Sequence, residues 1–228
     1  MLGFTTRIHP GDLTLAANSL TLKRKSPKQA RSKATVEAIL EATARVLVDD
    51  GFDRATTNRI AEVAGVSVGS LYQYFPNKRA LVRALLDRHH AEAVAMLPPG
   101  LADGAPTPLR KRIRLAVDWW LAAHAQDPAL HAVLSDVGRE IYGPEHVRHL
   151  EKLYHRRLRG ILANHADEVA PTNLDIAAFI LAQTLEALTH GAVVHHPELL
   201  ANEELADEMT ALITGYLCRE DAAARASA

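Results

Sequence analysis

This sequence of 228 residues is poor in cysteine, in aromatic residues and in long apolar runs. Cys218 is its single cysteine, so an internal disulfide is excluded and a reducing cytosol suits the chain. Aromatic residues make up 5% of the chain and strand-like alternation of Val and Ile is missing, whereas Ala and Leu abound, which predicts helices. No apolar run approaches the roughly 20 residues of a membrane span. The first twenty residues hold no continuous apolar block, so we expect no secretory signal.

Motifs of common enzyme classes are missing as well. The chain has no Gly-rich phosphate loop, no GxSxG sequence and no carboxylate pair that stands out from surface charge, so we expect no enzyme. A helical-bundle enzyme remains the competing class. Among the twelve histidines, His146 and His149 beside Glu145 are the best spaced for a metal, but no cysteine lies nearby. Surface histidine is the expectation, with no metal and no cofactor.

The net charge of −1 hides an uneven distribution. Residues 23–90 contain 13 Lys and Arg against 7 Asp and Glu, whereas residues 91–228 contain 12 against 19. Neutralisation of phosphates by basic residues supplies most of the sequence-independent affinity for DNA. The first segment is therefore expected to bind a polyanion, and the acidic remainder is expected to do something else.

Residues 56–78 predict two short helices around a tight turn. Thr57 is a suitable N-cap for a helix over 58–64 that places Ile60, Val63 and Ala64 on one face. Gly65 then ends that helix, because the turn needs a residue that tolerates positive φ. This is the first half of a helix-turn-helix unit.

Ser67 is expected to cap the second helix of the pair. Val68 and Leu71 can lie inward there, while Ser70, Gln73 and Tyr74 point away from the core. Such a helix can present its N-terminal half to base edges in the major groove of DNA. An ordinary helical corner is the alternative, but the second helix is short and polar for a core element, and basic residues flank the unit.

These residues resemble the DNA-binding domain of the TetR family, which comprises bacterial one-component transcriptional repressors. The resemblance covers about residues 31–92. The matching residues are Gly51–Thr57, Ile60–Ala61, Ala64–Ser67, Gly69–Tyr72, Tyr74–Phe75 and Asn77–Lys78. Tyr74 stands where many members have His, and Gln73 falls at a variable position. Both departures bear on which operator is bound.

The resemblance implies an all-α fold of about nine helices, with a three-helix helix-turn-helix domain followed by a helical ligand-binding and dimerisation domain. We expect a basic-ended, disordered extension over 1–25, the DNA-binding domain over 26–92, the regulatory domain over 93–220 and a flexible tail over 221–228. The basic segment from Lys23 to Lys33 is either an arm that contacts DNA or a solvated helix start.

The helices are expected at 32–50, from Asn77 to about 97, and then four or more in the second domain. Thr107–Pro108 and Asp127–Pro128 open two of these, Glu145 begins a basic helix, and Asn173 and Asn202 cap the last two. In the TetR family the last two long helices pair with those of a second copy, so we expect a homodimer that places its recognition helices about 34–36 Å apart.

The expected DNA contacts divide between bases and phosphates. Val68, Gly69, Ser70 and Gln73 would face bases, and Thr56, Thr57, Tyr72, Tyr74 and Lys78 would contact the backbone. Ser67 completes this set. Lys78 lies in the first turn of a helix, where the dipole disfavours a cation, so a phosphate partner is one explanation and an incidental surface lysine the other.

The expected function is that of an effector-responsive, cytoplasmic bacterial repressor on a palindromic operator, with double-stranded DNA, a second copy of the chain and a small molecule as partners. A ligand-independent architectural DNA binder is the alternative. The candidate pocket residues are Trp119, Trp120, His124, Tyr154, Phe179, Gln183, Glu186 and His190. Glu186 and His190 share a helix face and either orient a ligand, bond to each other, or meet across the dimer.

Overall fold

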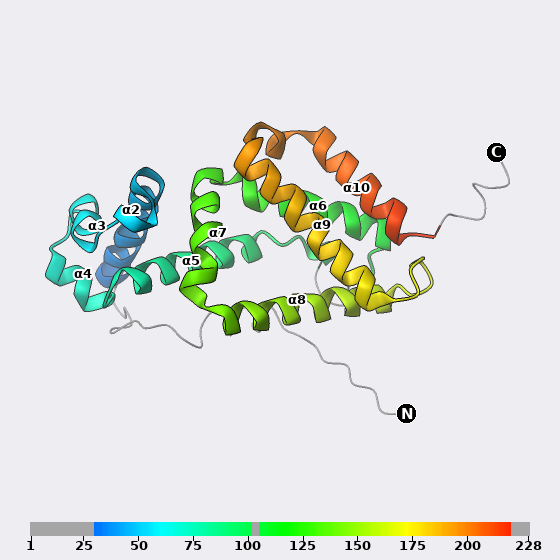
Figure 1. Ribbon diagram of the computed structural model, residues 1–228, viewed down its shortest axis with the longest axis horizontal. Helices are drawn as coiled ribbons and strands as arrows, with labels where there is room; N and C mark the ends of the chain where they lie inside the picture. The colour runs from blue at the N-terminus through cyan, green and yellow to red at the C-terminus, as the bar shows by residue number, and fades with distance from the viewer. Residues whose placement is uncertain (1–29, 102–104, 220–228) are drawn as a thin grey trace, which may run out of the picture. The chain divides into compact units, whose positions relative to one another are not determined.

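The structure, a computed structural model, describes residues 30–101 and 105–219. Its described part contains nine α-helices and two 3-10 helices, with no β-strand beyond one isolated antiparallel bridge between Val169 and Cys218 (Figure 1). The expected all-α fold of about nine helices is confirmed. The expected extension over 1–25 and the tail over 221–228 lie outside the described residues.

The helices begin and end close to the caps and breakers in the sequence. In chain order they are α2 (Ala30–Arg54), α3 (Thr57–Val63), α4 (Val68–Tyr74), α5 (Lys78–Ala95), η1 (Pro99–Leu101), α6 (Leu109–Ala125), α7 (Pro128–Tyr142), α8 (Pro144–Asn164), α9 (Leu174–His195), η2 (Pro197–Ala201) and α10 (Glu203–Leu217).

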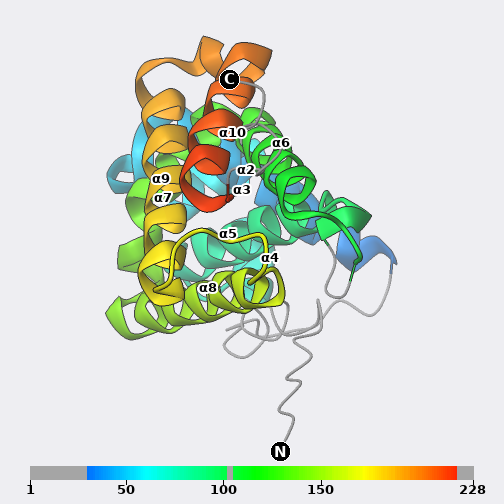
Figure 2. The ribbon, with the colours of Figure 1, turned by 90° about the vertical axis from the view of Figure 1, so that its right-hand side faces the viewer.

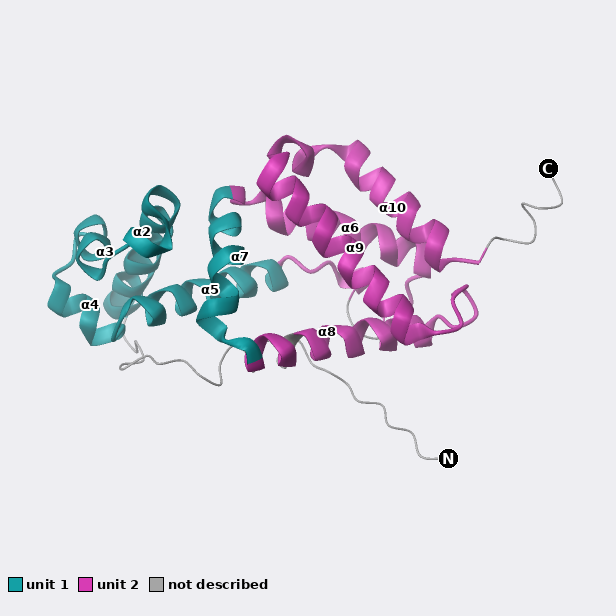
Figure 3. Cartoon of the chain, in the orientation of Figure 1, with its two compact units in different colours: residues 1–95, 129–144 teal, residues 96–128, 145–228 magenta. Residues whose placement is uncertain are grey.

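Two compact units make up the chain (Figure 3). Of the described residues, the first contains 30–95 together with Ala129–Pro144, and the second contains 96–101, 105–128 and 145–219. Helix α7 thus belongs to the first unit, although the sequence suggested a boundary near residue 92. The reason is its apolar face, since Leu130, Leu134, Val137 and Ile141 join the core cluster of that unit.

The core of the first unit is built from α2, α3, α4, α5 and α7. Ile39 and Leu47 of α2, Ile60 of α3, Leu71 of α4 and Leu85 of α5 are all 0% exposed and belong to one cluster. Gly51, expected to end the first helix, instead forms a kink with φ +75°, after which the chain makes one further turn to Arg54. Glycine suits this kink because it adopts a positive φ without the steric cost of a side chain.

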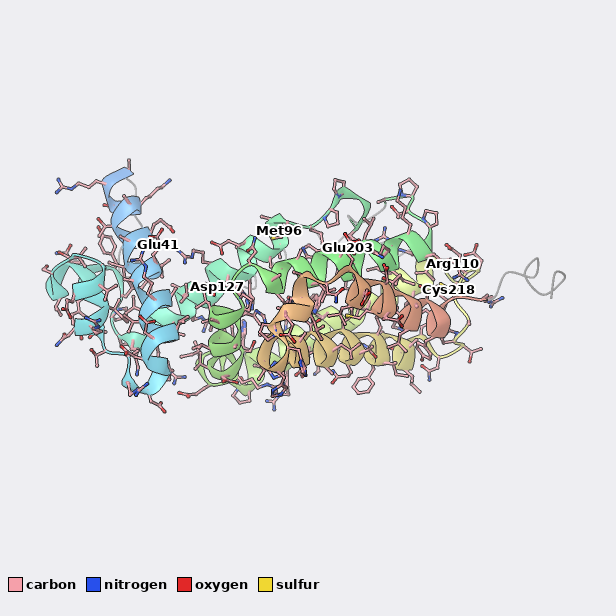
Figure 4. All side chains as sticks on the ribbon, turned by 90° about the horizontal axis from the view of Figure 1, so that it is seen from above. Glu41, Met96, Arg110, Asp127, Glu203 and Cys218 are labelled. Atoms are coloured by element: carbon pink, nitrogen blue, oxygen red, sulfur yellow. The ribbon has the colours of Figure 1, made fainter. Side chains whose placement is uncertain are left out.

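The second unit is arranged around α6. This helix packs against α9, α10 and η2, and Arg114 of α6 forms ion pairs with Asp118 on its own helix and with Asp207 on α10. Near Cys218, Arg110 donates from Nη2 to the carbonyl oxygen of Arg219 at 3.2 Å (Figure 4). The start of α6 therefore meets the end of α10, and the two helices run antiparallel.

Helices α9 and α10 lie side by side in two views of the second unit (Figures 1 and 2). Both leave large apolar side chains exposed: Ile176, Phe179, Ile180, Leu188 and Val194 on α9, and Leu212 and Tyr216 on α10. By length and mean hydropathy (1.4) α9 would also suit a bilayer, but helices that pack inside water-soluble proteins have the same properties. Because these large side chains are exposed, the second unit alone does not cover the whole apolar surface of α9.

Side-chain caps begin the last two long helices as expected. Oδ1 of Asn173 accepts from the N–H groups of Asp175 and Ile176, and Oδ1 of Asn202 accepts from that of Glu204. Helix α6 lacks such a local cap, because Pro108 precedes it. Its first N–H, that of Leu109, donates instead to Glu168 Oε2 at 2.9 Å. A distant carboxylate thus satisfies a helix N-terminus.

Glu168 also accepts from His165 Nδ1 at 2.7 Å. The hydrogen bonds from His165 and from the Leu109 N–H lower the pKa of Glu168 below its ordinary value. A depressed folded-state pKa contributes stability that is present above the unfolded pKa of about 4.3 and is lost as the pH falls through the folded pKa.

We predict that Glu168→Gln lowers the free energy of unfolding by about 1 kcal/mol at pH 7, because a charged acceptor at a helix N-terminus is replaced by a neutral one in a half-exposed position. Urea titrations at pH 7 and below pH 4 measure the difference from the wild type, which should shrink in acid. Glu151→Gln, at an exposed position of α8, is the control. A difference that is equal at both pH values would contradict the cap.

Candidate nucleic-acid interface

Helix α3 begins one residue earlier than the sequence suggested. Oγ1 of Thr56 accepts from the Arg59 N–H at 3.1 Å, so Thr56 is the N-cap and the expectation for Thr57 was wrong. Both threonines are plausible caps by composition, and only the extended backbone at Thr56 decides between them. Helix α3 then buries Ile60 and Ala61 against the core of the first unit.

The turn and the second helix follow the expected pattern. Gly65 has φ +65°, and Ser67 Oγ accepts from the Ser70 N–H at 3.0 Å to cap α4. Leu71 is fully buried, whereas Val68 is 36% exposed, so the expectation that Val68 lies inward was wrong. Helix α4 is therefore fixed mainly through its second half, and its first turn is open to solvent.

The outward face of α4 carries half of the predicted DNA contacts. Val68, Gly69, Tyr72 and Gln73 are exposed and Ser70 is half-exposed. The Tyr72 hydroxyl lies 3.0 Å from Thr57 Oγ1 on α3, which joins two of the predicted phosphate contacts. One surface, formed by α3 and α4, thus holds nearly all of these residues.

Tyr74 differs from the expectation. Its side chain is only 8% exposed and belongs to the core cluster. It follows Leu71 by three residues and precedes Phe75, which is 1% exposed, so these residues form the inward stripe of α4. The prediction that Tyr74 points away from the core was wrong, because the pattern from Ser70 to Gln73 was continued one residue too far.

Lys78 holds its charge within the protein. Its Nζ donates to the carbonyl oxygen of Phe52 at 2.6 Å and to that of Asp53 at 3.3 Å, and it lies 4.3 Å from the centre of the Phe52 ring. The residue is half-buried, so it is not a fully solvated lysine, and its expected contact with a phosphate stays a prediction. The sequence contained no signal for this contact across 26 positions.

Several other basic side chains of the first unit are paired. Arg59 bonds Glu62 at 3.0 Å on α3, and Arg88 of α5 bonds Glu37 of α2 at 3.3 Å. Arg79 bonds Glu140 of α7 at 2.5 Å. The positive excess counted from the sequence is therefore partly used in ion pairs on the surface of the unit.

The pocket candidates of the second unit fall into two groups. Trp119, Trp120 and His124 form a ring cluster on α6, with centroids 5.8 Å apart for the tryptophans and 5.0 Å apart for Trp120 and His124. The indole Nε1 of Trp120 and the hydroxyl of Thr189 on α9 are buried and have no hydrogen-bond partner among the described residues. Thr189, which is 0% exposed, was not among the predicted residues.

The other candidates lie on α8 and α9. Burial raises the pKa of Tyr154; the positive charge of Arg157 lowers it and the negative charge of Glu186 raises it further, so Tyr154 and Glu186 are within electrostatic reach. Tyr154 as a whole is 46% exposed. Phe179, Gln183, Glu186 and His190 are exposed on α9. Their role in a pocket stays a prediction.

Metal binding finds no support among the described residues, which contain no group of three or more His, Cys, Asp or Glu side chains suited to hold an ion.

Two family models match the chain. That of the bacterial regulatory proteins of the tetR family matches residues 39–85, and that of the tetracyclin repressor-like C-terminal domain matches residues 108–217. The first match contains α3, α4 and the start of α5, and the second contains α6–α10.

Individual proteins are similar over shorter or more divergent stretches. The nucleoid occlusion factor SlmA of Actinobacillus pleuropneumoniae is 42% identical over 65 residues, which is 28% of this chain and 32% of that protein, so the chain matches about a third of this relative's length. The regulator BetI of Rhizobium meliloti is 31% identical over 140 residues, 60% of this chain and 66% of that protein.

Among solved structures, SmeT, the repressor of a Stenotrophomonas maltophilia multidrug efflux pump, has a TM-score of 0.62 at 21% identity and covers 83% of this chain and 93% of its own. At this identity the likeness concerns the fold. The two family models, which match residues 39–85 and 108–217, establish that the chain belongs to the TetR family of DNA-binding transcriptional regulators.

Proposed function

We propose that this protein is an effector-responsive repressor of the bacterial cytoplasm that binds a palindromic operator as a homodimer. The observation that carries the proposal is the build of α4, whose first turn is exposed while Leu71 and Phe75 are buried in the core. A recognition helix must be held rigidly on one side and be open on the other to enter the major groove. The role is one of binding, not catalysis.

Bases and phosphates would be contacted by different residues of this surface. Gln73 is exposed and can bond an adenine bidentately, and Val68 can contact a thymine methyl group. A Cβ added at Gly69 would meet only Ser67 Oγ, at 3.9 Å, so the fold itself has room for a side chain there. Glycine at this position therefore serves a close approach to DNA. Thr56, Thr57 and Tyr72 would contact the phosphate backbone.

The homodimer rests on the apolar surface of α9 and α10. Phe179 is 58% exposed, and Leu212 is 56% exposed on the neighbouring helix. Large apolar side chains exposed on two neighbouring helices are unfavourable in water, and an isologous pairing of both helices would cover them with a matching surface. Such a dimer would present two α4 helices to successive turns of a duplex.

An effector site in the second unit is supported by its unsatisfied polar groups. Within the described part of the chain the Trp120 indole N–H and the Thr189 hydroxyl are buried without partners, and leaving such groups unpaired costs free energy that a bound ligand can recover. SmeT, whose fold is similar, has been solved in complex with triclosan. To release DNA, an effector would have to favour the DNA-incompetent form by several kcal/mol, about 5.5 kcal/mol for a nearly complete switch.

A ligand-independent architectural DNA binder is the second candidate. The test is a selection of bound fragments from a random DNA pool by the purified full chain, followed by a screen of metabolites for release and for thermal stabilisation. We expect an enriched inverted repeat and at least one compound that both stabilises the protein and releases the DNA. Binding that is indifferent to sequence and to every compound would favour the architectural role.

We predict that Gln73→Ala relaxes the base preference at one position of each half-site by about 1–3 kcal/mol, because a bidentate contact to one base is lost. Repeating the selection with the variant and measuring affinities for single-base changes gives this value. Tyr72→Phe is the matched comparison, since loss of a phosphate contact should weaken all sequences alike. An unaltered base preference in Gln73→Ala would show that Gln73 does not contact a base.

We predict that Phe179→Arg and Leu212→Arg each raise the dimer dissociation constant by about 100-fold or more. Because the dimer is symmetric, each substitution removes two copies of a buried side chain, and each copy contributes about 1.5–3 kcal/mol. Equilibrium sedimentation at micromolar concentration measures the change, and operator affinity should fall with it. Val48→Arg, at a 40% exposed position of α2, should leave the dimer intact. A wild-type monomer at this concentration would refute the interface.

A further inference from the structure

Lys78 begins α5, yet its charge is located at the end of a different helix. The side chain extends from the first turn of α5 to the carbonyl oxygens of Phe52 and Asp53, 2.6 and 3.3 Å from Nζ. These carbonyls follow the kink at Gly51, in the last turn of α2. The ammonium also lies over the Phe52 ring, 4.3 Å from its centre.

The helix dipoles account for this arrangement. A cation in the first turn of a helix is unfavourable, whereas a cation at the C-terminal end of a helix is favourable and satisfies carbonyl groups that lack intrahelical partners. Arg54 does the same one turn earlier, donating from Nε to the carbonyl oxygen of Asp50 at 2.8 Å. The Phe52 ring adds a favourable contact between the cation and its π face.

The contact joins the two ends of the segment that contains α3 and α4. Phe52 and Asp53 precede this segment, and Lys78 follows it directly. The backbone at the Lys78 end is itself held, because Asn77 Oδ1 accepts from the Ala80 N–H at 2.9 Å. A polar link across 25 and 26 positions thus closes the helix-turn-helix segment at its base.

We propose that Lys78, through its bonds to Phe52 and Asp53 and its contact with the Phe52 ring, is a positioning residue that fixes the α3–α4 pair for DNA binding. This set of contacts, the Lys78 clasp, uses the lysine charge inside the protein instead of on a phosphate. The proposal rests on the proposed function, since it concerns the orientation in which α4 meets DNA. It replaces the direct phosphate role that the sequence suggested for Lys78.

The two roles differ in the salt dependence of DNA binding. A lysine that neutralises a phosphate releases a counterion, so its removal lowers the slope of log affinity against log salt by about 0.9 and leaves the free protein unchanged. Loss of a clasp leaves that slope unaltered. It loosens the free protein and lowers operator affinity more than affinity for a mixed-sequence duplex.

The experiment compares Lys78→Met, which keeps an apolar stem over the Phe52 ring, with Lys78→Arg, which restores charge and donors. Phe52→Leu removes the ring and leaves the lysine in place, so it tests the clasp even where Lys78→Met folds poorly. Lys111→Met, at an exposed position of α6, is the matched lysine control. Each full-length protein is studied by amide hydrogen exchange without DNA, and by salt titrations on the selected operator and on a mixed-sequence duplex.

We expect Lys78→Met to increase the exchange of the Ala55 and Leu81 amides, which are bonded to Gly51 and Asn77 at the two ends of the segment, by about tenfold or more. Its operator affinity should fall by a similar factor, with affinity for the mixed-sequence duplex within about twofold and the salt slopes unaltered. Phe52→Leu should act in the same direction, Lys78→Arg should recover most of the loss, and Lys111→Met should match the wild type.

A slope lowered by about 0.9 in Lys78→Met, with unaltered amide exchange, would overturn the clasp in favour of a phosphate contact. Wild-type exchange and wild-type affinity in both Lys78→Met and Phe52→Leu would overturn it as well. A wild-type protein that binds neither duplex would refute the proposed function and the positioning role together. The exchange data would still decide whether the clasp holds the segment.

Discussion

The burial of one side of α4 is the constraint on which the first unit depends. This helix has seven residues, too few to be stable alone in water, so its shape and direction come from the core beneath it. Leu71, Tyr74 and Phe75 supply that anchorage from the second half of the helix and its end. The first turn does not pack against the core, so its exposed residues are available for contact with DNA.

The polar links around this core have a related effect. Arg88 joins α5 to α2 through Glu37, Arg79 joins α5 to α7 through Glu140, and Lys78 joins the start of α5 to the end of α2. Exposed ion pairs contribute little stability one by one, but bonds between separate helices restrict how those helices turn. A basic residue in such a protein can thus serve the shape of the DNA-binding surface as well as its charge.

In the second unit the notable feature is exposed apolar surface. Its helix α9 buries small side chains such as Ala178, Thr189 and Ala192 toward its neighbours while large apolar ones face outward. Small residues allow close approach within the chain, and the proposed dimer would cover the outward residues. The unpaired hydroxyl and indole groups in its interior are equally incomplete within a single chain. Dimerisation would cover the exposed apolar side chains, and ligand binding would separately satisfy the unpaired polar groups. This arrangement suits a regulator whose ligand alters DNA binding without dissociating the dimer.

The sequence by itself determined the helical class, the helix-turn-helix order, the family and most helix ends, because caps, prolines, glycines and apolar spacing act over a few residues. Asn173, Asn202 and Gly65 illustrate such local signals. Only the tertiary structure decided the burial of Tyr74, the cap at Thr56, the place of α7 in the first unit and the partners of Lys78 and Glu168. Each of these depends on which distant segment arrives beside a residue, and one-dimensional spacing carries no information about that neighbour.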